Sequence, residues 1–123
     1  FYSTMMESSS FGAILQWMEN HLQEELTVER LALEVHMSPR TFARHFREIT
    51  GTTPHQWLLQ QRILQAQRLL ETTEETIESV AALCGFSSAA MLRIHFQNIV
   101  HTSPLTYRRA FNLKRATTAS NIP

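Results

Sequence analysis

The sequence contains no aspartate, one cysteine and three glycines among its 123 residues. It has no His-Glu-x-x-His motif and no cluster of cysteines and histidines, the patterns that commonly hold a catalytic metal. No glycine-rich loop precedes a helix, so the sequence lacks the usual cradle for a nucleotide phosphate. The single cysteine, Cys84, excludes an internal disulfide and suits a reducing compartment. We therefore expect no enzyme, no metal and no cofactor, and a packing role for Cys84.

Long apolar runs are also missing, since no stretch approaches the roughly 18 residues that a membrane helix needs. The opening residues 1–4 lack the basic start and the apolar stretch of a signal peptide. We expect no membrane partner. The chain begins with Phe1 instead of methionine, so we expect a fragment of a longer protein that carries a further domain upstream.

Charge is balanced overall, with 11 basic and 11 acidic residues, yet it alternates in blocks along the chain. Residues 1–36 carry six Glu and one Arg (net −5), and residues 37–70 carry five Arg and one Glu (net +4). Residues 71–86 carry four Glu (net −4), and residues 87–123 carry four Arg and one Lys (net +5). Because a local basic field attracts a polyanion whatever the total charge, nucleic acid is not excluded.

What the chain does contain is one pattern written twice. Residues 26–57 return, with substitutions, as residues 75–107. The offset is 49 in the first part of the pattern and 50 in the rest, so the second copy has one extra residue, which we place at Gly85. A repeat of this length indicates a duplicated supersecondary unit, and the pattern of two short helices predicts a helix-turn-helix.

Apolar residues recur at spacings of three and four, which predicts an all-α protein. Serine and threonine caps, some followed by proline, mark the helix starts and predict seven helices: two helix-turn-helix subdomains joined by a long linker helix, a homeodomain-like tandem. The expected segments are a linker or disordered stretch at 1–10, a first unit at 11–53, the linker helix at 54–72, a second unit at 73–113 and a disordered tail at 114–123.

The second helix of the first unit separates an apolar face from a basic face. The apolar face, which we expect in the core, consists of Phe42, Phe46 and Ile49. Nearly opposite lie three arginines, Arg40, Arg44 and Arg47. Arginine can donate two parallel hydrogen bonds to guanine or to phosphate oxygens. An isolated arginine stripe is more often a solvated face, but inside a duplicated helix-turn-helix it predicts reading of the DNA major groove.

The corresponding helix of the second unit has a similar core face, formed by Leu92, Phe96 and Ile99. The positions that match the three arginines hold Ala90, Ile94 and Gln97, and Arg93 and His95 flank them. An exposed Ile94 can contact thymine methyl groups or a partner protein, or it is a tolerated surface residue. We expect this second reading helix to be weaker and more tolerant of A·T pairs.

Contacts with DNA phosphates are expected at helix N-termini and from the polar side chains around them. The hydroxyls involved can cap their helices at the same time. The candidates are Ser38, Thr41, Arg47, Thr53, Ser88, Gln97, Ser103 and Arg108. His45 and His95 hold equivalent places in the repeat, and for them a phosphate contact and a surface residue without special role both remain open.

Together these residues resemble the C-terminal DNA-binding domain of the AraC/XylS family of bacterial transcription regulators. The motifs that carry the resemblance are Met37-Ser38-Pro39-Arg40-Thr41-Phe42-x-Arg44-x-Phe46, Gly51-x-x-Pro54-x-x-Trp57, Arg62-x-x-x-Ala66-x-x-Leu69-Leu70, Ile77-x-x-Val80-Ala81-x-x-Cys84-Gly85-Phe86 and Thr102-Ser103-Pro104-x-x-Tyr107-Arg108-Arg109. The resemblance covers roughly residues 11–112. The first unit, with Gln61-Arg62-Ile63, is most similar to the branch whose upstream domain is amidotransferase-like.

The resemblance implies sequence-specific binding to double-stranded DNA, with two recognition helices in successive major-groove segments. Carried over by position, the residues that face bases are Arg40, Ala43 and Arg44 in the first site and Ala90, Arg93 and Ile94 in the second. Many members carry arginine where Ile94 stands. The resemblance also implies an activator that works at the nucleoid in the cytoplasm and contacts RNA polymerase. The alternative, from another class, is a helical protein-interaction module that has lost DNA reading and docks through Ile94.

Overall fold

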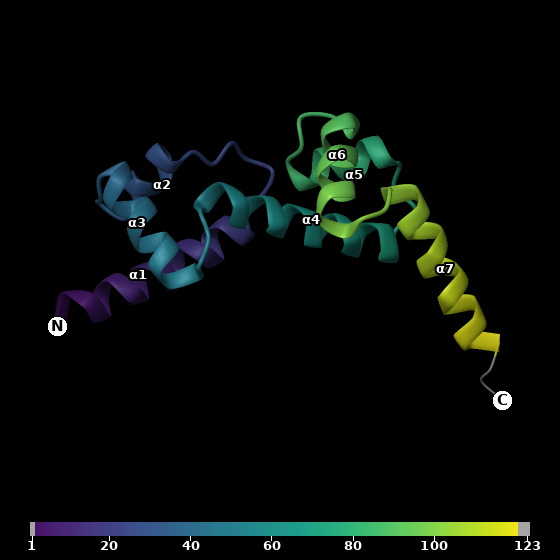
Figure 1. The fold of residues 1–123 in the computed structure, drawn as a ribbon, viewed down its shortest axis with the longest axis horizontal. Helices are drawn as coiled ribbons and strands as arrows, with labels where there is room; N and C mark the ends of the chain where they lie inside the picture. The colour runs from purple at the N-terminus through teal and green to yellow at the C-terminus, as the bar shows by residue number, and fades with distance from the viewer. Residues whose placement is uncertain (1, 121–123) are drawn as a thin grey trace. The chain divides into compact units, whose positions relative to one another are not determined.

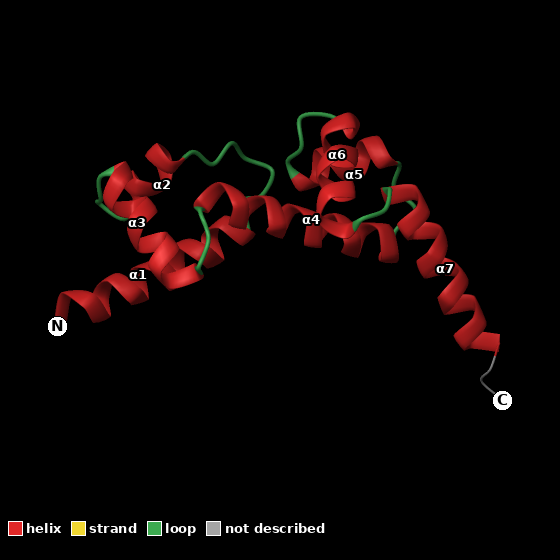
Figure 2. Ribbon diagram, in the orientation of Figure 1, coloured by secondary structure: helices red, strands yellow, loops and turns green. Residues whose placement is uncertain are grey.

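The computed structural model of the chain describes the backbone of residues 2–120 and the side chains of residues 11–117. Its contacts divide it into two compact units, Phe1–Gln61 and Arg62–Pro123, each of which is considered by itself. The described residues form seven helices and no strand (Figures 1 and 2). The prediction of an all-α fold with seven helices and two helix-turn-helix subdomains is confirmed.

The first unit contains α1 (Tyr2–Glu19), α2 (Val28–Glu34), α3 (Pro39–Thr50) and the beginning of α4 (Pro54–Thr72). All four helices supply its buried core, which consists of Phe11, Ile14, Met18, Leu31, Ala32, Phe42, Phe46 and Leu58. The rings of Phe11 and Phe42 stack with their centroids 5.3 Å apart. The ring of Phe46 meets Trp57 edge-on at 5.9 Å. Helix α3 is therefore fixed from one side by aromatic packing.

The second unit contains the rest of α4, with α5 (Ile77–Cys84), α6 (Ala89–Val100) and α7 (Pro104–Ser120). Its core consists of Ile63, Ala66, Leu70, Val80, Ala81, Cys84, Leu92 and Phe96. Phe96 meets Tyr107 edge-on at 5.5 Å, which reproduces the contact between Phe46 and Trp57 one repeat earlier. The duplication seen in the sequence is thus a duplication of core packing.

Four of the helices begin at the caps that the sequence predicts. The hydroxyls of Thr27, Ser38, Thr76 and Ser88 each accept a hydrogen bond from the backbone N–H three residues later, at 3.0–3.2 Å. Such bonds satisfy N–H groups that have no partner inside the helix. The starts of α2, α3, α5 and α6 are therefore set by local sequence.

The two ends of the chain differ from the expectation. Helix α1 begins at Tyr2, although residues 1–10 were expected to be a linker or disordered. Helix α7 continues to Ser120, through most of the tail expected at 114–123, and residues 121–123 lie outside the described part. No proline or glycine stands in residues 1–10 or 105–122, so neither segment carries a helix-stop signal.

Two isoleucines expected in the core are partly exposed, Ile49 at 46% and Ile99 at 37%. The helical wheel gives their angle correctly, but it does not give the length of the partner helix. Helices α2 and α5 have 7 and 8 residues, whereas α3 and α6 have 12. At about 1.5 Å per residue, the shorter partner cannot cover the full length of the longer helix.

The sequence suggested Gly85 as the extra residue of the second repeat. The structure instead places the extra residue at Ser87. Gly85 matches His36, since both have a positive φ, 91° and 57°. In both copies the next residue donates its N–H to an equivalent carbonyl, that of Ala81 or Ala32, at 2.9 Å. The additional residue comes after this bond and before the cap of α6.

Glycine and histidine exchange places at the left-handed positions of the two units. In the turn before the second helix, the first unit has His36 and the second has Gly85. At the C-cap of the second helix, the first unit has Gly51 (φ 81°) and the second has His101 (φ 65°). A left-handed residue with a side chain costs roughly 1–2 kcal/mol. Each unit therefore carries one strained and one unstrained turn.

We expect Gly51→Ala to lower the free energy of unfolding by about 1 kcal/mol. A Cβ at Gly51 meets no atom within 4 Å, so the loss is conformational. His101→Gly should raise the free energy by about 0.5 kcal/mol. Urea denaturation measures both changes. Gly12→Ala is the control, because Gly12 lies inside α1 with open space around it and alanine there should stabilise. Equal losses for Gly51→Ala and Gly12→Ala would contradict this explanation.

Candidate nucleic-acid interface

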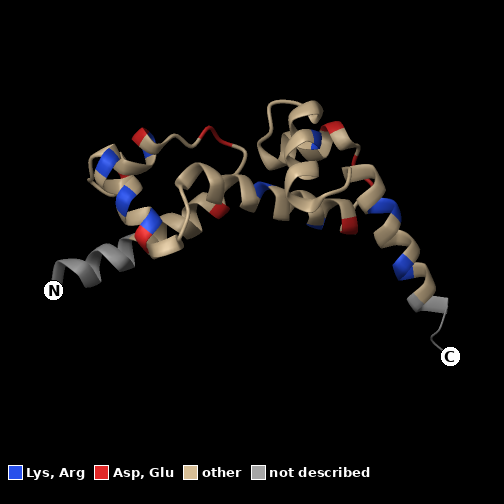
Figure 3. Cartoon of the chain, in the orientation of Figure 1, with Lys and Arg blue, Asp and Glu red and all other residues tan. Residues whose placement is uncertain are grey.

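Helix α3 presents three arginines on the side opposite its buried rings. Arg40, Arg44 and Arg47 are exposed, whereas Phe42 and Phe46 are completely buried. The spacing i, i+4, i+7 places the three guanidiniums along one stripe of the helix. Figure 3 shows the basic positions in blue along the length of α3. The core contacts of the phenylalanines thus aim the arginines away from the protein.

The carboxylate of Glu48 is the neighbour of one arginine in this stripe. Arg44 Nε lies 4.0 Å from Glu48 Oε1, and both side chains are about two thirds exposed. Exposed pairs of this kind contribute about 0–1 kcal/mol, and arginine ahead of glutamate is the less favourable order along a helix. The pair is weak enough for a DNA group to replace Glu48.

The N-terminus of α3 is capped by the Ser38 side chain. Ser38 Oγ donates to Thr41 Oγ1 at 2.9 Å and accepts from the Thr41 N–H at 3.2 Å. Ser38 is exposed, and Thr41 and Ala43 are half-buried beside the arginine stripe. These three predicted contact residues therefore lie on or next to the same face as the arginines.

Helix α6 repeats the arrangement with weaker chemistry. Leu92 and Phe96 are buried. The predicted contact residues are exposed, namely Ser88, Ala90, Arg93, Ile94 and Gln97. Ile94 exposes 53% of its surface, so this helix offers a methyl-rich face where α3 offers guanidiniums.

The sequence reasoning missed an acidic residue beside this face. Arg93 Nη2 lies 3.7 Å from Oε1 of Glu78, which belongs to the first turn of α5. The wheel of α6 contains no information on side chains that a neighbouring helix brings to it. Glu78 had counted only as one charge of the acidic block at residues 71–86.

Thr53 and Ser103 begin α4 and α7 in equivalent places of the two units. Their hydroxyls accept from the N–H groups of Gln56 and Thr106, at 3.2 and 3.1 Å. Ser103 Oγ also donates to Thr106 Oγ1 at 2.8 Å, as Ser38 does in α3. The capping role expected for both residues is confirmed, and a phosphate contact stays a prediction.

Arg108, a predicted phosphate contact, donates to backbone carbonyls of its own unit. Its Nε donates to the carbonyl oxygen of Leu70 at 3.1 Å, and its Nη1 donates to that of Glu75 at 2.7 Å. Beside it the Tyr107 hydroxyl donates to the carboxylate of Glu71. Burial raises the pKa of Tyr107, and the hydrogen bond to Glu71 raises it further. The last carbonyls of a helix lack partners within it. Arg108 supplies one at the end of α4, and its phosphate contact stays a prediction.

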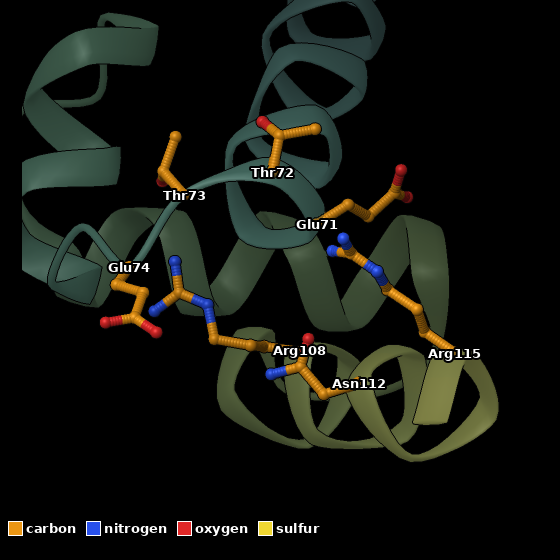
Figure 4. A pocket seen from close by; sticks show the side chains of 7 residues that line it. All are labelled: Glu71, Thr72, Thr73, Glu74, Arg108, Asn112 and Arg115. Carbon is orange, nitrogen blue, oxygen red and sulfur yellow. The ribbon is translucent and has the colours of Figure 1, made fainter. Parts of the chain in front are cut away.

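A cavity of about 400 Å³ lies beside this guanidinium (Figure 4). Its lining mixes both charges, with Glu71, Thr72, Thr73, Glu74, Arg108, Asn112 and Arg115. The carbonyl end of α4 makes the place unfavourable for an anion, and Arg108 is already bonded there. The cavity therefore gives no reason to place a phosphate contact at this end of the unit.

The two equivalent histidines pack against phenylalanine rings. The ring centroids of His45 and Phe11 lie 6.0 Å apart, and those of His95 and Phe86 also lie 6.0 Å apart. All four side chains belong to the margins of the two cores or to the cores themselves. Packing is thus a sufficient role for both histidines.

Cys84 is completely buried, and burial raises the pKa of its thiol to about 12. The thiol therefore stays protonated at neutral pH, and its predicted packing role is confirmed. Within the described part of the chain, no group of three or more histidine, cysteine, aspartate or glutamate side chains is placed to hold a metal ion.

Among the described helices, no single one is long and apolar enough to cross a membrane. Helices α5 and α6 taken together pass on length and composition, with a bend of 81° between them. Val80, Cys84 and Phe96 of this pair are buried in the core of the second unit.

Comparison with known proteins gives consistent relatives. A family model described as a helix-turn-helix domain matches residues 31–110. The HTH-type transcriptional activator RhaS of Escherichia coli O139:H28 is 29% identical over 102 residues, which cover 83% of this chain and 37% of that protein. RhaS of Pectobacterium carotovorum is 30% identical over 106 residues, 86% of this chain and 38% of that protein. The chain thus spans about two fifths of the RhaS proteins that it matches.

Solved structures agree with the sequence relatives. The DNA-binding domain of AdpA, a global transcriptional factor crystallised in complex with a target DNA, superimposes with a TM-score of 0.83. It is 47% identical, and the match covers 85% of this chain and 95% of that one. An AraC-type regulator from Chromobacterium violaceum gives a TM-score of 0.77 at 27% identity, over 85% of this chain and 94% of that one.

Two helix-turn-helix units, each with its own core and with an exposed face on its second helix, define a class of DNA-binding proteins. The chain belongs to the AraC-type helix-turn-helix family of transcription regulators, of which it is the DNA-binding domain. The members of this family are DNA-binding regulators, so the chain is not an enzyme.

Proposed function

We propose that this chain reads double-stranded DNA sequence-specifically, as the DNA-binding domain of a bacterial transcription activator. The observation that carries the proposal is the stripe of Arg40, Arg44 and Arg47, exposed on the second helix of a helix-turn-helix unit. An arginine in the major groove can donate to guanine O6 and N7 together. The target DNA in the AdpA structure and the activator RhaS among the relatives support the same reading.

The two units have unequal roles in this proposal. Helices α3 and α6 enter successive major-groove segments of the promoter or operator. In α3 the base contacts come from Arg40, Ala43 and Arg44, and the two arginines favour a guanine-containing site. In α6 they come from Ala90, Arg93 and Ile94, with Ile94 against thymine methyl groups. The phosphate contacts come from Ser38, Thr41, Arg47, Thr53, Ser88, Gln97 and Ser103.

The longer protein is also a matter of proposal. Because the chain spans about two fifths of the RhaS proteins, we infer an upstream sensory or dimerisation domain in the full-length protein. An activator works by contact with the transcription machinery, so RNA polymerase is the proposed protein partner. The place of action is the nucleoid in the cytoplasm.

Selection of random duplexes by the purified 123-residue chain, followed by sequencing, tests the proposal. We expect an enriched site with a guanine-containing box and a separate box richer in A·T pairs. One box alone would restrict α6 to anchoring. The absence of any enriched sequence would contradict sequence-specific reading. It would favour the alternative, a protein-interaction module, for which the 53% exposure of Ile94 is the supporting observation.

Salt dependence separates the two functions independently of the sequence selected. Binding through several phosphates should weaken as salt rises, with a log–log slope of about −0.9 for each phosphate neutralised. A protein-interaction module should show a weak attachment to DNA at low salt that is equal for all sequences.

A further inference from the structure

We propose that Glu78 is a specificity-determining residue for DNA binding. By pairing with Arg93, its carboxylate holds the guanidinium away from DNA phosphates and leaves it for a base contact strong enough to displace the pair. The inference rests on the proposed function and deepens it. It assigns a role in recognition to an acidic residue of α5, outside the predicted recognition helix.

Helix α6 carries little positive charge. Arg93 is the one lysine or arginine in Ala89–Val100, whereas α3 contains three arginines. Attraction to phosphates without regard to sequence grows with the number of such charges. Whatever controls the guanidinium of Arg93 therefore controls the whole formal positive charge of this recognition helix.

Glu78 lies on α5, within reach of Arg93. It lies in the first turn of α5, just after the cap residue Thr76, where the positive end of the helix dipole favours a carboxylate. Its Oε1 is 3.7 Å from Arg93 Nη2. Because the carboxylate belongs to another helix, it holds the guanidinium toward α5 instead of letting it extend freely toward DNA.

Arg93 can leave Glu78 for either of two DNA groups, a guanine or a phosphate. The side chains of Arg93 and Glu78 are 53% and 73% exposed, and an exposed pair is weak and screened. A guanine offers two acceptors in the geometry of the guanidinium fork and can displace the carboxylate. A phosphate can also accept from the fork, but it is negatively charged, and a phosphate that binds Arg93 must lie beside the carboxylate of Glu78, which repels it. The pair thus penalises non-specific binding more than specific binding.

The first unit shows that the arrangement is particular to the second. With the offset of 49, Glu78 matches Glu29, which lies in the first turn of α2. With the offset of 50, Arg93 matches Ala43. The carboxylate is therefore present in both copies, but an arginine stands opposite it in the second copy alone. Glu29 is a matched control for removal of one negative charge at this place in the fold.

The experiment compares Glu78→Gln with the unchanged chain on two duplexes, the enriched site and a scrambled duplex of the same composition. We expect binding to the scrambled duplex to tighten about two- to fivefold, the range that exposed ion pairs allow. Its salt slope should become steeper by about 0.9, which corresponds to one additional phosphate. Binding to the enriched site should change less than this, so that the preference for the site falls, by at most two- to fivefold.

Two further variants decide whether the pair is the cause. In a chain that carries Arg93→Ala, the change Glu78→Gln should have no effect on the preference. Glu29→Gln should also leave it unchanged. If Glu29→Gln reproduces the effect, or if Glu78→Gln acts equally without Arg93, general repulsion explains the result and this inference is overturned alone. A chain without any site preference would overturn the proposed function, and this inference with it. Circular dichroism verifies that the exposed substitutions leave the fold unchanged.

Discussion

Replacing Arg44 by alanine should weaken binding to the enriched duplex by about 1–3 kcal/mol, roughly five- to 150-fold in Kd. Arg44 lies in the middle of the exposed stripe of α3, two thirds exposed, with Glu48 as a weak neighbour at 4.0 Å. Its loss removes a bidentate donor to guanine without disturbing the core. We expect the preference at the guanine-containing box to relax while the second box is unaffected.

The measurement is a titration of the enriched duplex and of duplexes mutated in either box, by fluorescence anisotropy. Arg68→Ala is the control, because Arg68 is an exposed arginine of α4 outside both recognition helices. The control should change affinity little and sequence preference not at all. Equal losses on every duplex would show that Arg44 binds phosphates and reads no base.

Replacing Phe46 by alanine should destabilise the first unit by about 3–5 kcal/mol, the usual loss for a buried phenylalanine. Phe46 is completely buried. Its ring lies 5.7 Å from that of Phe42, 5.9 Å from that of Trp57 and 6.3 Å from that of Phe11. The loss is a large part of the roughly 5–15 kcal/mol that stabilises a domain.

The two separate cores determine how the loss should spread. Amide hydrogen exchange should show protection falling in α1, α2 and α3 while α5 and α6 stay protected, because Phe96 and its neighbours form their own cluster. Ile49→Ala is the control on the same helix. Ile49 is 46% exposed, so we expect a loss below about 1 kcal/mol. Equal loss of protection in both units would mean that α4 couples them into one cooperative block.

The starts of four helices could be predicted from the sequence, because they depend on residues close together in the chain. A hydroxyl three residues before an N–H is a short-range device, so the caps Thr27, Ser38, Thr76 and Ser88 are correct. At the two ends of the chain, α1 and α7 continue through residues predicted to be a linker and a tail. Neither end of the chain has a glycine or proline at the point where a helix was expected to begin or end.

The exposure predicted for the arginine stripe of α3 agrees with the structure, whereas its contacts with DNA stay predictions. Arg40, Arg44 and Arg47 lie outside because Phe42 and Phe46 on the same helix must lie inside. Periodicity contains this information completely. It contains less about Ile49 and Ile99, whose burial depends on how far a neighbouring helix reaches.

The partners of Arg108 and Glu78 could not be predicted from the sequence. Both are charged residues in places where a DNA contact or a solvated surface was the natural expectation. Arg108 instead donates to the carbonyls of Leu70 and Glu75, more than 30 positions away in the chain. Glu78 meets Arg93 across two helices. Neither partner follows from spacing within one helix.

The sequence by itself determined the elements, their starts, the duplication and the face on which the arginines of α3 lie. Each of these depends on residues within a few positions of one another or on a repeat visible in one dimension. The tertiary structure alone decided which charges have partners on other elements: it occupies Arg108 at the end of α4 and pairs Arg93 with Glu78, whereas Arg44 in the stripe of α3 has Glu48 of its own helix as a weak neighbour. Side-chain charges act through space over a few ångströms, and helices that pack together bring such distances about between residues far apart in the chain.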